Sequence, residues 1–166
     1  MGTRLLTEQL IRGQYPQLKY VRAHTTGRNA ATLYAWNENL ELSEAEAAEL
    51  KKFAHNGLTS FICFRVKAYS QLREDRVPGE GRLPERIARA AVDPELGPDE
   101  VVAAMNATMV SGTVTYRRYD YCSGTLHFDV FADKAAAAEE KELARRYLSE
   151  MIPLGTRCEL AYRLFG

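Results

Sequence analysis

The chain has 166 residues, 46% hydrophobic and 27% charged, and its 22 basic residues are balanced by 22 acidic ones. This composition is typical of one folded domain over residues 1–166. It argues against a disordered chain, which needs low hydrophobicity and high net charge, and against a DNA-binding or membrane-surface protein, which needs a basic excess.

The first half of the chain alternates helix and strand signals. Apolar residues at helical spacing predict a helix over 3–12, and residues 17–31 are mixed enough to suggest a loop or an irregular edge. A strand is expected at 32–36. Ser43 and Glu46 form a capping-box pattern that opens a helix ending near Asn56-Gly57, and a strong strand follows over 59–69.

The second half begins with an irregular stretch from Arg73 to about Arg86, whose role as a mobile lid or a solvated loop stays open. Two helices are expected in a helical insert over 84–110. Strands at 113–121 and 125–131 flank Ser123-Gly124, a hairpin signal. Asp133 is expected to cap a helix over 134–151, and a strand at 156–165 closes the region 113–165.

Two strand–helix–strand units, 32–69 and 125–165, both open with Thr-Leu. With the N-terminal helix and the hairpin they predict an α+β fold. We expect a largely antiparallel five-stranded sheet with helices mainly on one face, a ferredoxin-like variant with added helices. The helices at 43–56 and 134–151 should pack on the same face of that sheet.

The hairpin predicts a charged face. If Ser123-Gly124 is the turn, Asp120 lies opposite His127 and Arg118 lies opposite Asp129. Alternation then separates these polar residues from an apolar layer formed by Tyr119, Tyr121, Leu126, Phe128 and Val130.

The same alternation in the strands at 61–69 and 157–165 extends this polar face. The candidate binding residues on it are Arg65, Lys67, Tyr69, Arg118, Asp120, His127, Asp129 and Arg163. Arg157, Glu159, Phe61, Tyr116 and Phe165 are expected nearby, and Tyr34 and Trp36 are further candidates. Arginine offers bidentate donors to carboxylate or phosphate, and aromatic rings offer stacking surfaces.

Four interpretations of this face stay open: a solvated surface, a homodimer interface, a site for a small aromatic or anionic ligand, and a platform for single-stranded RNA. His127 beside Asp120 or Asp129 would also suit general-base catalysis in a cofactor-independent enzyme, with Arg118 as a clamp. The sequence alone assigns no residue a catalytic role.

Motifs for cofactors are missing. The sequence contains no phosphate-binding loop, no nucleophile elbow and no His-Glu-x-x-His. Its three cysteines, Cys63, Cys122 and Cys158, are far apart and form no C-x-x-C pair, so we expect free thiols and no metal. No apolar run is long enough for a signal peptide or a membrane helix.

The sequence therefore favours a cytoplasmic, bacterial, non-enzymatic protein that binds a small molecule or a protein partner, including a second copy of itself, through the open sheet face. The alternatives are the enzyme built on His127 and the RNA-binding module. DNA and membranes are not expected partners, and RNA is a weaker expectation than a small ligand.

Overall fold

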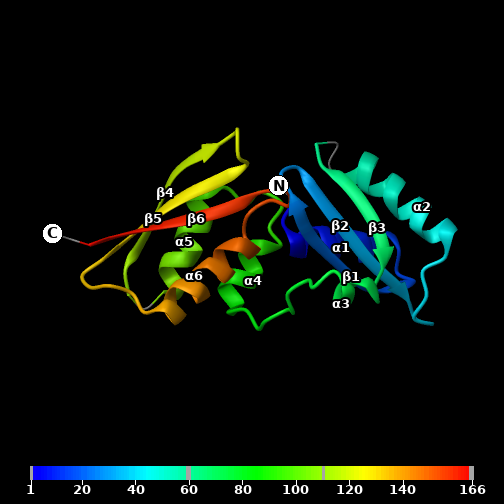
Figure 1. Cartoon of the computed structure of the whole chain (residues 1–166), viewed down its shortest axis with the longest axis horizontal. Coiled ribbons are helices and arrows are strands. Elements are labelled where there is room, and N and C mark those ends of the chain that lie inside the picture. Colours follow the sequence, from blue (N-terminus) through cyan, green and yellow to red (C-terminus); the bar gives the residue numbers. More distant parts are fainter. Residues whose placement is uncertain (1, 59–60, 110, 165–166) are drawn as a thin grey trace.

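The computed structural model describes residues 2–58, 61–109 and 111–164. Six strands form two separate three-stranded sheets, and helices pack against one face of each sheet (Figure 1). The fold is therefore α+β, and the prediction of one five-stranded, largely antiparallel sheet is wrong.

The first unit runs from the N-terminus to the third strand. Its elements in chain order are α1 (Arg4–Gln14), β1 (Leu18–Gly27), β2 (Ala30–Asn37), α2 (Glu44–Phe53), a π turn at Ala54–Leu58 and β3 (Cys63–Ala68). β2 lies in the middle, antiparallel to β1 and parallel to β3. The predicted capping box of α2 is confirmed, because Ser43 and Glu46 form it, and the structure also places Thr3 as the cap of α1.

The second unit repeats this order of elements. It consists of α5 (Pro98–Thr108), β4 (Thr113–Asp120), β5 (Thr125–Ala132), α6 (Ala138–Glu150) and β6 (Arg157–Leu164). β5 is the middle strand of the second sheet; it is antiparallel to β4 and parallel to β6, just as β2 is antiparallel to β1 and parallel to β3. Two short helices, α3 (Gln71–Glu74) and α4 (Glu85–Ala91), lie in the connection between the units. α6 begins at Ala138, so the expected cap at Asp133 is wrong.

The two units correspond strand by strand. In the first, Asn29 has a φ of 53° and its carbonyl accepts the Cys63 N–H at 2.8 Å; in the second, Gly124 has a φ of 65° and its carbonyl accepts the Arg157 N–H at 2.9 Å. Ala30 is therefore equivalent to Thr125. In this alignment Thr32 corresponds to His127, so the Thr-Leu pairs at 32–33 and 125–126 are offset by two positions. An offset of two keeps each leucine on the core side of its strand.

Each unit has its own apolar cluster between its sheet and its helices. In the first, Ile11 of α1 and Leu50 of α2 pack against Leu33 and Phe64. In the second, the cluster also includes α4 and is built around Met105, Phe128 and Leu148, among others. The helices expected at 43–56 and 134–151 cover two different sheets, which corrects the prediction that they share one.

The prediction of a single sheet is wrong because the sequence pattern does not reveal β1. Residues 17–31 contain all of β1, the turn after it and the first two residues of β2, and they read as irregular because a bulge near Lys19 breaks the alternation of apolar residues. Without β1, the remaining five strands were assigned to one sheet. With it, each unit has a hairpin and a parallel third strand, which is a complete sheet of its own.

Backbone contacts connect the two units at the hairpin between β1 and β2. The Asn29 N–H donates to the Gly155 carbonyl at 3.0 Å, and the Gly155 N–H donates to the Thr25 hydroxyl at 2.9 Å. Figure 1 shows the loop before β6 reaching this hairpin. Within the described part of the chain, none of the helices has both the length and the apolar character that a membrane-spanning helix needs.

Candidate functional site

The hairpin of the second unit has a different register from the one predicted. The turn takes four residues, Tyr121–Gly124, so Asp120 pairs with Thr125 and Arg118 pairs with His127. A bulge at Arg117 then changes the side to which the earlier residues point.

As a result, Tyr116 pairs with Phe128 and packs against the core instead of joining the polar face. Tyr121, expected in the apolar layer, is 81% exposed. The separation of Leu126, Phe128 and Val130 from the polar side chains of β5 is as predicted.

The eight candidate binding residues lie on two separate sheets. Arg65, Lys67 and Tyr69 belong to the first unit, and the other five, Arg118, Asp120, His127, Asp129 and Arg163, belong to the second. Phe165 lies outside the described residues. The sequence predicts a single polar face, but the structure divides these residues between two faces, one on each sheet.

On the second sheet the charged residues have separate partners. Arg163 Nε lies 3.2 Å from Asp129 Oδ1, and His127 Nδ1 lies 3.5 Å from Glu159 Oε2. Asp120 accepts a hydrogen bond from the Cys122 N–H, which lowers the pKa of that carboxyl. Each ion pair has one partner largely exposed to solvent, which screens it, and the pairs leave no group directed at a common point.

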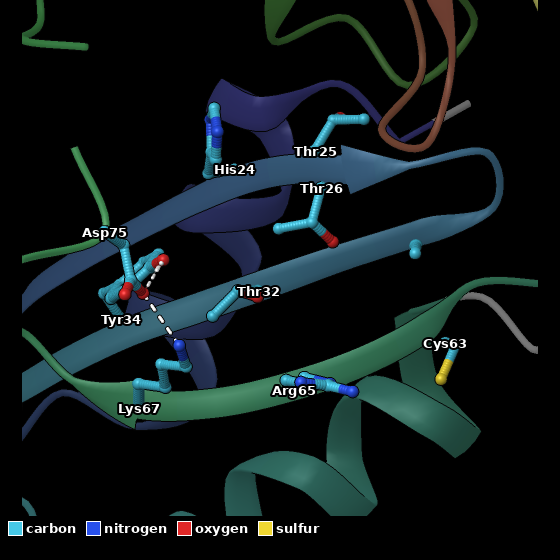
Figure 2. A pocket seen from close by; sticks show the side chains of 10 residues that line it. His24, Thr25, Thr26, Thr32, Tyr34, Cys63, Arg65, Lys67 and Asp75 are labelled. Carbon is cyan, nitrogen blue, oxygen red and sulfur yellow. Dashed lines mark hydrogen bonds and ion pairs between the residues drawn. The ribbon is translucent and has the colours of Figure 1, made fainter. Parts of the chain in front are cut away.

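The first sheet has a pocket of about 640 Å³ on the face opposite α1 and α2 (Figure 2). β1 and β2 contribute His24, Thr25, Thr26, Ala30, Thr32 and Tyr34, β3 contributes Cys63, Arg65 and Lys67, and Asp75 comes from the segment after α3. Strand alternation explains the lining, because the neighbours of these strand residues in sequence, such as Leu33 and Phe64, face the core.

A hydrogen-bonded network lies at one end of the pocket. The Tyr34 hydroxyl donates to Asp75 Oδ2 at 2.7 Å, and Lys67 Nζ donates to the same oxygen at 2.8 Å. Tyr34 and Lys67 are direct neighbours across the β2–β3 ladder. Figure 2 shows Asp75 approaching them from outside the sheet. This contact fixes the segment after α3 over the sheet face.

The pKa shifts of Tyr34, Asp75 and His24 favour one protonation state of each group at neutral pH. Burial, followed by the hydrogen bond to Asp75, raises the pKa of Tyr34 to about 12, so the hydroxyl stays protonated. The hydrogen bond from Lys67, followed by that from Tyr34, lowers the pKa of Asp75. Burial and the charge of Arg22 lower the pKa of His24, which favours its neutral form.

Arg65 is a lining residue of this pocket whose positive charge is not paired by another described residue. Its side chain is exposed, and within the described residues its guanidinium has no ion-pair or hydrogen-bond partner. Lys67, by contrast, is paired with Asp75. An incoming anion would therefore find its donor at Arg65 and polar groups at Thr32 and His24.

Aromatic rings continue the same face beyond the network. Trp36 follows Tyr34 on β2, and its ring centroid lies 5.4 Å from that of Tyr69 and 6.1 Å from that of Tyr20. These rings touch one another, so they form a filled cluster with one accessible side and not an open cage. Tyr20 remains 44% exposed.

The sequence pointed to Arg65, Lys67 and Tyr69, and named Tyr34 and Trp36 as further candidates. It missed His24, because β1 was not recognised, and Asp75, because residues in a long connection have no periodic signal. Across residues 2–58, 61–109 and 111–164, no three His, Cys, Asp or Glu side chains gather in a way that could hold a metal ion.

No family model matches the chain, and no curated protein matches its sequence. Function is therefore inferred from the chemistry and geometry of the pocket.

Proposed function

We propose that the protein is a non-enzymatic binding protein for a small aromatic anion, which it binds on the face of the first sheet. The observation that carries the proposal is the exposed Arg65, which has no partner in the described part of the chain, in a pocket whose other charges neutralise one another. Arginine binds carboxylate through two parallel hydrogen bonds and stays charged at every working pH.

The rings of Trp36 and Tyr69 supply the aromatic part of the proposal. Residues 65 and 69 are four positions apart on one side of the chain, or roughly 13 Å along a strand. A ligand of about two fused rings with one acidic group would reach from Arg65 past Lys67 toward this cluster. Ring contacts of this kind contribute about 0.5–1.5 kcal/mol beyond area burial.

The enzyme alternative built on His127 has weaker support. It requires His127 beside Asp120 or Asp129, whereas His127 Nδ1 lies 3.5 Å from Glu159 Oε2 and Asp129 pairs with Arg163. The RNA alternative requires a continuous basic and aromatic surface, and the aromatic rings here form one compact cluster.

The chain's only tryptophan, Trp36, offers a direct binding assay. We expect 6-nitro-2-naphthoate, a two-ring aromatic carboxylate whose nitro group quenches indole fluorescence, to quench Trp36 in a saturable way. The neutral 6-nitro-2-naphthamide should quench without saturating. Arg65→Gln should weaken the saturable binding about 10-fold, because one charge-assisted bidentate contact is lost.

Arg163→Gln is the matched control, because Arg163 also lies on the outer side of a third strand but is paired with Asp129. It should bind as the wild type does. Equal weakening by both variants, or equal saturation with the neutral amide, would overturn the proposal.

A second copy of the chain is the competing occupant of this face. The sequence-based expectation of a homodimer can be tested by light scattering against the monomer mass of 18.7 kDa. If the Trp36 face forms the dimer interface, saturating 6-nitro-2-naphthoate should shift the mass toward the monomer.

A further inference from the structure

A second cavity, of about 790 Å³, lies where the two units meet. It is bounded by β1, by the segment at 78–81, by α6 and by the start of β6 together with the loop before it (Figure 1). Six arginines line it, and they come from both units: Arg4, Arg22, Arg28, Arg145, Arg146 and Arg157. Three glutamates line it as well: Glu142, Glu150 and Glu159. The cavity is thus cation-rich in a chain of zero net charge.

The two arginines nearest the core are already engaged. Arg4 forms ion pairs with Glu8 at 3.0 Å, Glu80 at 2.9 Å and Glu150 at 2.8 Å. Arg22 has a side chain only 9% exposed; it donates to the Pro78 carbonyl and lies 3.4 Å from Glu80.

The Nε of Arg22 is buried and has no hydrogen-bond partner among the described residues. A buried donor without a partner is costly, because it has lost its water without gaining another acceptor. Arg22 therefore keeps one unsatisfied donor in the wall of the cavity, on a side chain that is nine-tenths buried.

The other four arginines have no carboxylate partner in the described part of the chain, and two of them are held in place by the backbone. Arg28 packs over Gly124, where a Cβ would lie 2.7 Å from its Cγ, and donates to the Cys122 carbonyl. Arg146 lies against Gly81 and donates to the Arg82 carbonyl. Both glycines leave room that any side chain would fill. The guanidinium groups of Arg145 and Arg157 have neither an ion-pair nor a hydrogen-bond partner among residues 2–58, 61–109 and 111–164.

We propose that this cavity binds the phosphate groups of a small polyphosphate-bearing molecule. Phosphate offers several oxygens to guanidinium groups in bidentate geometry, and arginines from both units could bind neighbouring phosphates at once. One carboxylate would use too few of these donors. The proposal does not rest on the aromatic-anion site, since only the wall at His24–Thr26 is common to both cavities.

Isothermal titration calorimetry with sodium tripolyphosphate tests directly whether the cavity binds linked phosphate groups. We expect binding in a 1:1 ratio that weakens as salt is added, because exposed charges are screened. Arg157→Gln and Arg145→Gln should each weaken it at least ~10-fold, the loss expected for one charge-assisted contact. Thermal unfolding of each variant, measured without ligand, should match the wild type.

Two control variants make the result specific. Arg117→Gln removes an exposed arginine on β4 outside the cavity, and Arg65→Gln removes an arginine that lines the other pocket. Neither should change the affinity for tripolyphosphate. Equal weakening by Arg117→Gln, binding in a ratio well above 1:1, or binding only of oligonucleotides and not of tripolyphosphate would overturn the proposal. Loss through Arg65→Gln alone would place the phosphate in the other pocket, which also overturns it.

Discussion

Gly155 connects the two units, and replacing it with alanine should destabilise the protein. Gly155 has a φ of 79°, in the left-handed region that L side chains avoid. A Cβ there would lie 3.0 Å from the Asn29 Cα and 3.2 Å from the Asn29 nitrogen. These are backbone atoms of a tight hairpin, so they cannot move aside as a flexible side chain would.

The expected loss combines two contributions. The left-handed conformation costs alanine about 1–2 kcal/mol relative to glycine. Moving the Asn29 backbone away would also stretch the hydrogen bonds that Gly155 makes with Asn29 and Thr25, each of which stabilises a fold by about 0.5–1.5 kcal/mol. We expect Gly155→Ala to lower the free energy of unfolding by about 2–4 kcal/mol.

Gly13→Ala is the matched control, because it is the same chemical change at a helical position. Gly13 lies in α1, and nothing lies within 4 Å of a Cβ built there. Alanine should stabilise this position by about 0.5–1 kcal/mol. The two substitutions should therefore have opposite signs.

Urea denaturation followed by two signals measures both effects. Trp36 fluorescence reports the first unit, and far-UV circular dichroism reports both. If the Gly155 contact couples the units, the two transitions coincide in the wild type and separate in Gly155→Ala. A Gly155→Ala protein within ~0.5 kcal/mol of the wild type would refute the reasoning.

Three further predictions concern stability and thiol access. Leu148→Ala should lower the free energy of unfolding by about 2–5 kcal/mol, measured by urea denaturation, because Leu148 is fully buried in the second core. The folded pKa of Asp75 lies below its unfolded value of about 3.9, so its contribution is present above that pH and is lost as pH falls further; acid unfolding of Asp75→Asn should lack this component. Two thiols, Cys63 and Cys122, should react rapidly with a disulfide reagent, and Cys158 only on unfolding, since burial raises its pKa; three fast thiols would contradict this.

Local signals predicted the elements well. Ser43 and Glu46 form the expected capping box because both partners lie within four residues of each other. The strand around Phe64 and the amphipathic helix around Leu148 also follow from periodicity within one segment. Such information is carried by neighbouring residues, so a single sequence is enough to read it.

The pairing of strands was not predictable in the same way. A bulge near Lys19 concealed β1, and a second bulge at Arg117 moved Tyr116 to the core side. Each bulge adds one residue and reverses the alternation beyond it. No turn signal marks either position, so the division into two sheets could not be read from the pattern.

The candidate site shows the same limit. Arg65 and Lys67 were placed on the polar face by alternation, which is a local property. Asp75 reaches Tyr34 across 41 positions of sequence, through a segment without periodicity. The pairing that neutralises Lys67, while Arg65 has no partner among the described residues, is therefore visible only in three dimensions.

Equivalent positions of the two sheets can be compared, and the comparison shows that the outward-facing residues of the first sheet differ from those of the second. Inward positions keep one role: Leu33 and its counterpart Phe128 are both buried in their cores. Outward positions differ. Where the first unit has Tyr34 hydrogen-bonded to Asp75, the equivalent position of the second is Asp129, which forms an ion pair with Arg163 of the adjacent strand β6. Both partners of the Asp129–Arg163 pair belong to one sheet. On the first sheet, Asp75 comes from the segment after α3; it accepts the Tyr34 hydroxyl, neutralises Lys67 and lines the pocket. Because packing alone requires none of these contacts, the face of the first sheet is the better candidate for a binding function.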